Sequence, residues 1–423
     1  MTAVAKTCLN AYGVAGTVLK RSPLLPNICY PQLKRRVSSK TPFDINDSDD
    51  KYKELNDYYR DLFTNDNVNT TLGATSKINI KTEIDLLNDE LANLTDTAVP
   101  PHKLPLRSED LQRVVETPGR FVIKSRSNDP YFNLALEHYI FKNTPLFEQS
   151  IFSSQRLLFY VNNKCAVIGK NQTIWQELYL NELNKRGYEV LRRLSGGGAV
   201  IHDLGNVNYS FLTSREEFRT TFFNQLIVQW LNKQGHIQDF ELNGRGDILY
   251  KKMKCGGSAF KIARGKSYHH GTMLVNSDID SFHGLLKPSG QKGVRWVSPS
   301  VDSVRAGVTN IPLGSTEQFI DICTDGFQKY FKSADSIPVY YCNDTVSTNS
   351  EIEKTRALLR SDKWKYCSGP KFKVELDSSH DVIEVEKGIV VSSTIPNIKG
   401  MDFQRLIDTG SNEAQLQCLK PLM

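Results

Sequence analysis

Residues 190–211 combine three consecutive glycines with two arginines in the sequence VLRRLSGGGAVIHDLGNVNYSF. A glycine-rich turn between strands exposes backbone N–H groups that can converge on an anion, and the missing Cβ atoms let a ligand approach closely. Arg193, just before the glycines, could add a two-pronged contact to a phosphate. The segment has neither the GKS/T nor the GxGxxG spacing, which excludes a Walker A loop and a dinucleotide-binding fingerprint. The pattern favours an anion site on a turn between strands, and a tightly packed turn is the alternative interpretation.

A second segment, residues 251–275, places Lys254 before the glycine pair Gly256-Gly257. A lysine fixed at that point could neutralise a phosphate and a carboxylate while they react. The alternative is a solvated lysine in a basic run. His269 and His270 are adjacent, so on a strand they would point to opposite faces and one would belong to the core. No ligand spacing accompanies them, and no metal site is predicted.

Periodicity in the surrounding chain predicts a mixed, largely antiparallel sheet with flanking helices. Order is expected to begin near Arg120. Strands are expected at 120–125, 189–193, 206–213 and repeatedly within 246–277, and a hairpin at 156–170. Helices are expected at 127–143, 174–190, 216–235 and 315–331. From about residue 347 a helix at 351–361 and strands at 371–377, 382–388 and 389–395 predict a smaller domain.

The net charge of +6 comes from the N-terminus. Residues 1–43 contain seven Lys/Arg and no Asp or Glu, so the remainder has 46 basic and 47 acidic residues. A basic, acid-free leader is typical of a mitochondrial transit peptide, with a basic tail as the alternative. The balanced remainder predicts no nucleic-acid-binding face, and no apolar run predicts a membrane span. Residues 44–100 hold 13 acidic and five basic residues and two short helical patterns. Six scattered cysteines outside the leader, without CxxC, indicate a reducing compartment.

Seven motifs occur in one order: NLALE (133–137), VIGKNQTIWQE (167–177), RRLSGGGAVIHDLGNVNYSF (192–211), GRGDILY (244–250), KCGGSAFK (254–261), HHGTMLVNSDI (269–279) and VDSVRAGVTNI (301–311). Together they resemble the lipoate–protein ligase A family, of the mitochondrial, fungal type. The resemblance covers about 120–345, with a weaker match of WKYCSGPKF (364–372) to the family's accessory domain.

The resemblance implies an α+β biotin/lipoyl protein ligase fold, similar to class II synthetase cores, with a small α+β C-terminal accessory domain. It implies that lipoate or octanoate reacts with ATP and Mg²⁺ to give an acyl-AMP. The acyl group then passes to a lysine on lipoyl domains of 2-oxoacid dehydrogenase E2 subunits and on the glycine-cleavage H protein. The implied organisation is a transit peptide at 1–43, an acidic, partly disordered extension at 44–118, a catalytic domain at 119–345 and the accessory domain at 346–423. A monomer in the mitochondrial matrix is expected.

Site residues follow from the matching motifs. Lys254 matches the lysine that contacts both ATP and the lipoyl carboxyl, and is the implied catalytic residue. The implied ATP site comprises Arg193, Gly198, Ala199, Val200 and Ile201 together with Lys254. The implied lipoate site comprises Lys254, Ser195, Gly196 and Gly197.

One departure from the family wording keeps alternatives open, because Cys255-Gly256 stands where the family usually has a serine. A related acyltransferase would use acyl-coenzyme A or an acylated carrier protein without ATP, and Cys255 or Cys165 could be its nucleophile. A buried core thiol is the other interpretation of each cysteine. A noncatalytic scaffold for lipoyl domains is the remote alternative.

Overall fold

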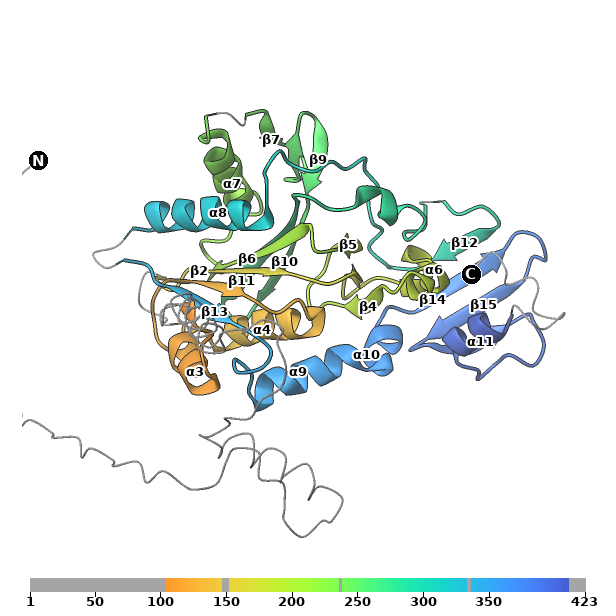
Figure 1. Cartoon of the computed structure of the whole chain (residues 1–423). Helices are drawn as coiled ribbons and strands as arrows, with labels where there is room; N and C mark the ends of the chain where they lie inside the picture. Colours follow the sequence, from red (N-terminus) through yellow and green to blue (C-terminus); the bar gives the residue numbers. More distant parts are fainter. Residues whose placement is uncertain (1–102, 147–151, 236–237, 289, 333–335, 411–423) are drawn as a thin grey trace, which may run out of the picture. The chain divides into compact units, whose positions relative to one another are not determined.

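The computed structural model describes residues 103–146, 152–235, 238–288, 290–332 and 336–410, all within one compact unit, Leu91–Met423 (Figure 1). The predicted transit peptide and the helical patterns within 44–100 lie outside the described residues. In the part that is described, no helix is long and apolar enough to cross a membrane.

A six-stranded sheet forms the centre of the fold. Its strands, in order across the sheet, are β10 (Ser258–Ala263), β11 (Lys266–Leu274), β6 (Asn206–Ser214), β2 (Arg156–Val161), β1 (Phe121–Ser125) and β13 (Val339–Cys342). The pairs from β10 to β2 are antiparallel, and β1 runs parallel to both of its neighbours. The register aligns Tyr160, Asn208 and Thr272 in one row across β2, β6 and β11. The prediction of a mixed, largely antiparallel sheet is confirmed.

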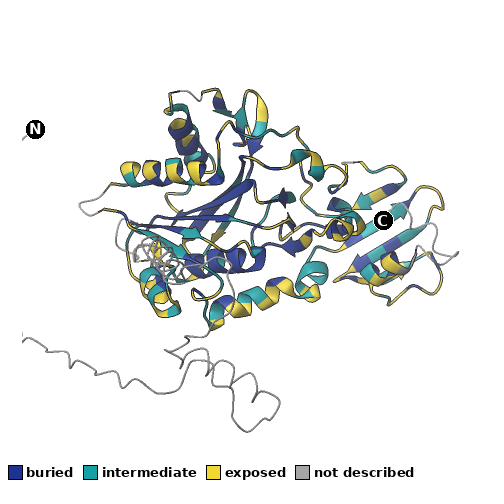
Figure 2. Ribbon diagram, viewed as in Figure 1, coloured by how far each residue is buried: buried dark blue, intermediate teal, exposed yellow. Residues whose placement is uncertain are grey.

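Helices cover both faces of this sheet (Figure 1). Alternate residues of β2 separate into two cores, because successive side chains of a strand point to opposite faces. Leu158 and Tyr160 pack with α4 (Pro130–Asn143), whereas Leu157 and Phe159 pack with α7 (Phe222–Asn232) and α8 (Thr316–Tyr330). Figure 2 shows the sheet and α4 as the most deeply buried elements. Pro130 opens α4 and the carboxylate of Asp129 accepts from the Tyr131 N–H, which is the helix start expected from the sequence.

Two small sheets flank the central one. The first has the order β4 (Glu189–Arg192), β3 (Cys165–Ile168) and β5 (Val200–His202), and the second has β7 (Phe240–Leu242), β8 (Ile248–Tyr250) and β9 (Met253–Gly256). The triple glycine connects β4 to β5, and Gly257 connects β9 to β10. The first glycine segment therefore joins two strands of a small sheet, and the second joins a small sheet to the edge strand β10 of the central sheet.

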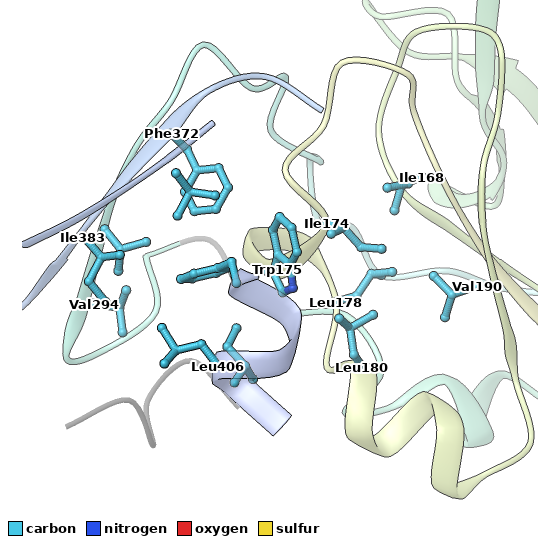
Figure 3. Close-up of a cluster of buried hydrophobic side chains, with 14 of the residues drawn as sticks. Ile168, Ile174, Trp175, Leu178, Leu180, Val190, Val294, Phe372, Ile383 and Leu406 are labelled. Atoms are coloured by element: carbon cyan, nitrogen blue, oxygen red, sulfur yellow. The ribbon is translucent and has the colours of Figure 1, made fainter. Parts of the chain in front are cut away.

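A four-stranded sheet forms the C-terminal region, in the order β12 (Val294–Val297), β14 (Phe372–Leu376), β15 (Val382–Glu386) and β16 (Ile389–Ser393). Its core continues into the first small sheet: Trp175 lies between Phe372 and Leu178 in Figure 3. The Trp175 ring contacts Phe372 and Phe403 at centroid distances of 5.5 and 5.0 Å. β12 comes from the part of the chain that precedes β13, so residues on both sides of position 345 build this sheet.

Further helices complete the described part: α3 (Ser108–Glu116), α5 (Ile174–Glu177), α6 (Leu180–Lys185), α9 (Ser350–Arg360), α10 (Asp362–Cys367), α11 (Phe403–Gly410) and the short 3₁₀ helix η3 (Ile279–Phe282). The predicted helices at 315–331 and 351–361 and the C-terminal strands are confirmed.

Four local predictions are wrong. The helix expected at 174–190 is two short helices, because Leu178 pairs with Leu286 and the Tyr179 N–H donates to Leu285. The hairpin expected at 156–170 does not form, because β2 and β3 enter different sheets. α7 begins at Phe222 rather than 216. Order begins earlier than residue 120, because α3 buries Leu111 and Val115.

Candidate active site

One cavity lies where the central sheet meets both small sheets. Its empty volume is about 980 Å³, open mouth included. Tyr160, Asn208 and Thr272, the row that crosses β2, β6 and β11, line it from the central sheet. The central sheet also contributes Ser258 and Ala259 of β10 and His270 and Gly271 of β11. The other lining residues come from α4, the first small sheet with the glycine turn, the segment around β9 and residues 302–304; they are Leu134, Val167, Arg193, Gly198, Ala199, Val200, His202, Arg245, Asp247, Lys254, Gly257, Asp302, Ser303 and Val304.

The two glycine segments singled out in the sequence therefore meet at one cavity. Of the predicted site residues, Arg193, Gly198, Ala199, Val200 and Lys254 line it. The other four, Ser195, Gly196, Gly197 and Ile201, are not among its lining residues. Ile201 follows Val200 on a strand, so its side chain points the other way, into the core shared with the C-terminal sheet.

Arg193 stabilises the triple-glycine turn through hydrogen bonds. The buried guanidinium donates to the carbonyls of Val167, Gly196 and Gly198 and to the Ser195 hydroxyl at 2.6–3.2 Å. Burial lowers the pKa of Arg193 to about 10, so the group stays charged at neutral pH. The hydrogen bonds of Arg193 thus go mostly to the turn itself, and this residue shapes the turn that borders the cavity.

At two of the three glycine positions, close contacts leave no room for a Cβ atom. Gly197 has φ +90°, and a Cβ there would lie 2.8 Å from the Arg193 guanidinium and 2.9 Å from the Ala259 methyl. A Cβ on Gly198 would lie 3.0 Å from the Ser303 hydroxyl. Gly196 has open space around it. Glycine at positions 197 and 198 therefore lets the turn pack closely against Arg193 and against the segment that carries Ser303.

Ser303 caps the turn from the opposite side. Its hydroxyl accepts from the Ala199 N–H at 2.7 Å and from Gln172 Nε2 at 3.0 Å. The Ser303 N–H in turn donates to the buried Glu177 carboxylate, which also pairs with Arg305. The amide of Ala199 that the resemblance places at the nucleotide is thus already directed at an oxygen atom in this structure.

Lys254 faces this turn from β9. Its amine forms an ion pair with Asp247 at 2.9 Å, and the lysine side chain is 25% exposed. It lies over Gly257, where a Cβ would be 2.9 Å from Nζ, so glycine is required for the lysine to take this position. Burial raises the pKa of Asp247, but hydrogen bonds from Asn243 and Lys254 outweigh it and lower the pKa below its usual value. The resulting carboxylate holds the ammonium in the cavity.

A buried acid–histidine pair supports the floor of the cavity. His270 lies between Glu137, at 3.0 Å from Nδ1, and the Ser195 hydroxyl, at 2.8 Å from Nε2. Burial raises the pKa of Glu137, but the charge and hydrogen bond of His270 outweigh it and lower the pKa. His269 points to the other face, among Phe260 and Tyr209, which confirms that one of the two histidines belongs to the core.

Neither candidate thiol reaches the cavity. Cys255 and Cys165 are fully buried and are not among the lining residues. Burial raises the pKa of Cys255 to about 12 and that of Cys165 well above its usual value. The core-thiol interpretation therefore describes both residues. Within the described residues, no group of three or more His, Cys, Asp or Glu side chains could hold a metal ion.

Comparison with known proteins shows to which family this chain belongs. The model of the lipoyl protein ligase A/B catalytic domain matches residues 129–328. A protein of Saccharomyces cerevisiae named "Putative lipoate-protein ligase A" is 44% identical over 371 residues, which cover 86% of this chain and 90% of that protein. The chain belongs to the lipoate-protein ligase A family. The resemblance predicted from the sequence motifs is confirmed.

Two further comparisons agree with this membership. A Schizosaccharomyces pombe protein of the same name is 33% identical over 293 residues, 64% of this chain and 77% of that protein. The crystal structure of P. falciparum LipL1 in complex with lipoate superposes with a TM-score of 0.50 and 27% identity, over 64% of this chain and 83% of that one. The predicted fold is confirmed: a mixed α/β lipoate-protein ligase catalytic fold with an additional C-terminal sheet.

Several cavity residues of this ligase-family chain were not singled out from the sequence. Asp247 and Ser303 lie inside the shared motifs GRGDILY and VDSVRAGVTNI, and an acidic residue seven positions before a candidate lysine was an available signal. Asn208 likewise lies inside the shared motif at 192–211, whereas Tyr160 lies outside the shared motifs, and its alignment with Asn208 depends on the register between β2 and β6.

Proposed function

We propose that this chain is an ATP-dependent lipoate–protein ligase that acts as a monomer in the mitochondrial matrix. It converts lipoate or octanoate and ATP to acyl-AMP. It then transfers the acyl group to the lysine of apo lipoyl domains in 2-oxoacid dehydrogenase E2 subunits and in the glycine-cleavage H protein.

The observation that carries this proposal is the position of the Lys254 amine. Asp247 and Gly257 hold it in the same cavity as the Gly198-Ala199 turn. A carboxylate and a phosphate repel each other as they approach, and a fixed ammonium between them offsets that repulsion in the transition state. The apolar lining residues Leu134, Val167 and Val200, together with the Tyr160 ring, offer a site for an acyl chain.

The chemistry then has two balanced steps. A carboxylate oxygen of the acid attacks the α-phosphorus of ATP, and the bond from that phosphorus to pyrophosphate breaks. The neutral amine of the target lysine attacks the acyl carbonyl, AMP leaves with the electrons of the anhydride bond, and the amine loses a proton. Because the target amine is the nucleophile, the reaction needs no cysteine or serine nucleophile on this chain.

Mg²⁺ accompanies the nucleotide in this proposal. A hard cation is bound by one or two carboxylates together with substrate phosphates, so three protein ligands are not required. Asp247 and Asp302, the two carboxylates that line the cavity, fit that role. They would hold the ion, whose positive charge would offset the negative charge of the phosphates.

The acyl donor that the chain uses distinguishes a ligase from an acyltransferase of the same fold. Incubation of the full chain with lipoate, ATP, Mg²⁺ and one apo lipoyl domain should give a lipoylated lysine and one pyrophosphate for each lysine modified. Transfer from octanoyl-coenzyme A without ATP, with no pyrophosphate from either free acid, would replace the ligase by the acyltransferase. The burial of Cys255 and Cys165 speaks against a covalent thiol intermediate in either case.

The basic, acid-free composition of residues 1–43 supports the mitochondrial location. Fusing this segment to a fluorescent protein should direct it to mitochondria. A fusion in which Lys34, Arg35 and Arg36 are replaced by glutamine is the matched control and should remain in the cytosol. Cytosolic fluorescence of the first fusion would contradict the proposed location.

A further inference from the structure

A chain of buried side-chain hydrogen bonds ends at His202, which lines the cavity. Ser125 donates to the Asn133 carbonyl oxygen at 2.6 Å, and Asn133 Nδ2 contacts Asn162 Oδ1 at 2.9 Å. Asn162 Nδ2 then contacts His202 Nδ1 at 3.1 Å. Asn133, Asn162 and His202 are almost completely excluded from solvent. The proposed function leaves this chain of contacts without a role.

The direction of each hydrogen bond follows from the assignment of one atom, Asn133 Nδ2. Asn133 Nδ2 lies 2.8 Å from the backbone carbonyl of Ser127, which can only accept, so this atom must be the nitrogen. It therefore also donates to Asn162, whose facing atom must be the oxygen. The remaining Asn162 group is the NH₂, which donates to His202. Nδ1 of His202 is thus an acceptor.

A neutral imidazole with an accepting Nδ1 carries its proton on Nε2. Burial, with smaller contributions from Arg193 and His270, lowers the pKa of His202 to about 3, so the ring is neutral near pH 7. The Cys165 thiol, 3.8 Å from Nδ1, can only add a second donor to the same nitrogen. Nε2 is buried and has no hydrogen-bond partner among the described residues. His202 lines the cavity and therefore carries a buried N–H that has no acceptor among the described residues.

His202 lies at the opposite end of the cavity from Lys254. Lys254 lies over Gly257, which exchanges backbone and side-chain hydrogen bonds with Thr272 on β11. His202 is joined to Asn162, which directly follows β2. β11 and β2 are separated by β6, so the two ends are two strand spacings apart, roughly 10 Å. That span is comparable to an extended eight-carbon acyl chain.

We propose that His202 determines acyl specificity by donating its Nε2–H to a dithiolane sulfur of lipoate, and that Asn162 and Asn133 position it as the donor. The inference rests on the proposed function, because it takes the carboxyl end of the acid to lie at Lys254. Divalent sulfur is a weak acceptor, whereas the terminal methyl group of octanoate accepts no hydrogen bond. With octanoate the buried N–H stays without a partner, as in the ligand-free chain, so only lipoate gains the free energy of this hydrogen bond. The site therefore favours lipoate over octanoate.

The test compares the two acids in the full chain with ATP, Mg²⁺ and one apo lipoyl domain. We expect wild-type kcat/KM to favour lipoate, and His202→Leu to reduce the lipoate-to-octanoate ratio about tenfold. His202→Gln is the matched variant, because its amide NH₂ restores a donor near the position of Nε2, and it should retain most of the ratio. Asn162→Leu, which removes the fixed acceptor role of Nδ1, should reduce the ratio by less than His202→Leu.

Nitrogen NMR of ¹⁵N-histidine-labelled protein supplies a readout that does not depend on activity. We expect His202 to show a protonated Nε2 and an unprotonated Nδ1 in wild type, and a mixture of tautomers in Asn162→Leu. Calorimetric binding of lipoate and octanoate without ATP measures the same preference. If the chain forms no pyrophosphate, the proposed function fails, while the binding ratio and the tautomer still decide the inference.

Any one of the following results would overturn the inference. One is a lipoate-to-octanoate ratio that is equal in wild type, His202→Leu and His202→Gln. Another is an equal loss for both acids in His202→Leu, which would place the histidine at the carboxyl end shared by the two ligands. The third is a wild-type His202 with its proton on Nδ1, or a chain that binds neither acid.

Discussion

At the scale of single residues, the site depends on cations that are held by fixed partners. Lys254 and Arg193 were both expected to contact the ligand, yet their surroundings differ. The Lys254 amine is partly exposed and has one carboxylate partner, whereas Arg193 is buried and donates to three carbonyls of its own neighbourhood. The lysine is thus available to a ligand, and the arginine holds the turn in place.

Replacement of Lys254 should therefore affect chemistry more than folding. We expect Lys254→Ala to lower kcat/KM for lipoate-dependent pyrophosphate formation by about a hundredfold or more, the range found when one electrostatic donor is removed. Thermal unfolding should change little, because the side chain is partly exposed. Lys252→Ala is the control: that side chain is exposed and pairs with Glu241, outside the cavity lining, so its kcat/KM should match wild type. Equal activity of Lys254→Ala and wild type would exclude the proposed role of the lysine.

His269 should make the protein sensitive to acid. Burial lowers the pKa of His269 to about 3, against 6.5 for an exposed histidine, and both ring nitrogens are buried without hydrogen-bond partners in the described part of the chain. Between these values the unfolded chain binds a proton that the folded chain excludes, so stability falls as pH decreases from about 6.5 toward 3. The loss for such a group is about 2 kcal/mol at pH 5.

His269→Phe removes this titration and suits the aromatic surroundings of Phe260 and Phe223. Urea unfolding at pH 7 and pH 5 should show that the variant loses less stability on acidification than wild type. His283→Gln, at an exposed position, is the matched control and should keep the wild-type difference. The same difference in His269→Phe and wild type would contradict the expectation.

At the scale of elements, α4 and α9 are joined by charge at the start of α4. The Asp129 carboxylate caps α4 and also pairs with Arg356 and Arg360 of α9. α9 in turn leads through α10, whose Trp364 indole donates to the backbone of Arg192 beside the glycine turn. The C-terminal helices thus hold both α4 and the strand before the turn.

Two substitutions separate the cap of α4 from the ion pairs. Asp129→Asn keeps an acceptor for the Tyr131 N–H and removes the charge, whereas Asp129→Ala removes both. We expect losses of about 1 kcal/mol for asparagine and roughly twice that for alanine, measured by urea unfolding. The loss in Asp129→Asn should shrink in 1 M salt, because screening weakens the wild-type ion pairs. Equal losses in both variants at all salt concentrations would contradict this division.

At the scale of the whole described unit, one hydrophobic core connects the first small sheet with the C-terminal sheet (Figure 3). Trp175 on α5 packs on Phe372 and Phe403, and its indole donates to Gln404 at 2.6 Å. The two regions should therefore unfold together.

Removing the indole should destabilise both regions at once. Trp175→Ala is expected to cost about 4 kcal/mol, and Trp175→Phe clearly less, because it leaves a smaller cavity. Calorimetry should show one transition shifted to lower temperature in each variant. Separate transitions for the C-terminal region and the remainder would contradict a shared core.

Much of this architecture could be predicted from the sequence, and what could not has a common cause. Local signals located α4 through Asp129 and Pro130, and the glycine segments through their flanking cations. Long-range pairing decided the rest: Leu178 breaks a helical pattern because it pairs with Leu286, and β2 and β3 separate because each finds a partner elsewhere. In the site, Lys254 was recognisable, but Ser303 and His202 gain their positions from contacts between distant segments.

The pairing of β12 with β14 has a consequence for dividing the gene. A chain divided between positions 345 and 346 would have β12 on the first polypeptide and β14, β15 and β16 on the second. Each product would carry an unsatisfied row of backbone N–H and C=O groups beside an apolar surface, a combination that promotes aggregation. Two separately encoded fragments would therefore form a functional protein only if they associated soon after synthesis and re-formed the hydrogen bonds between β12 and β14.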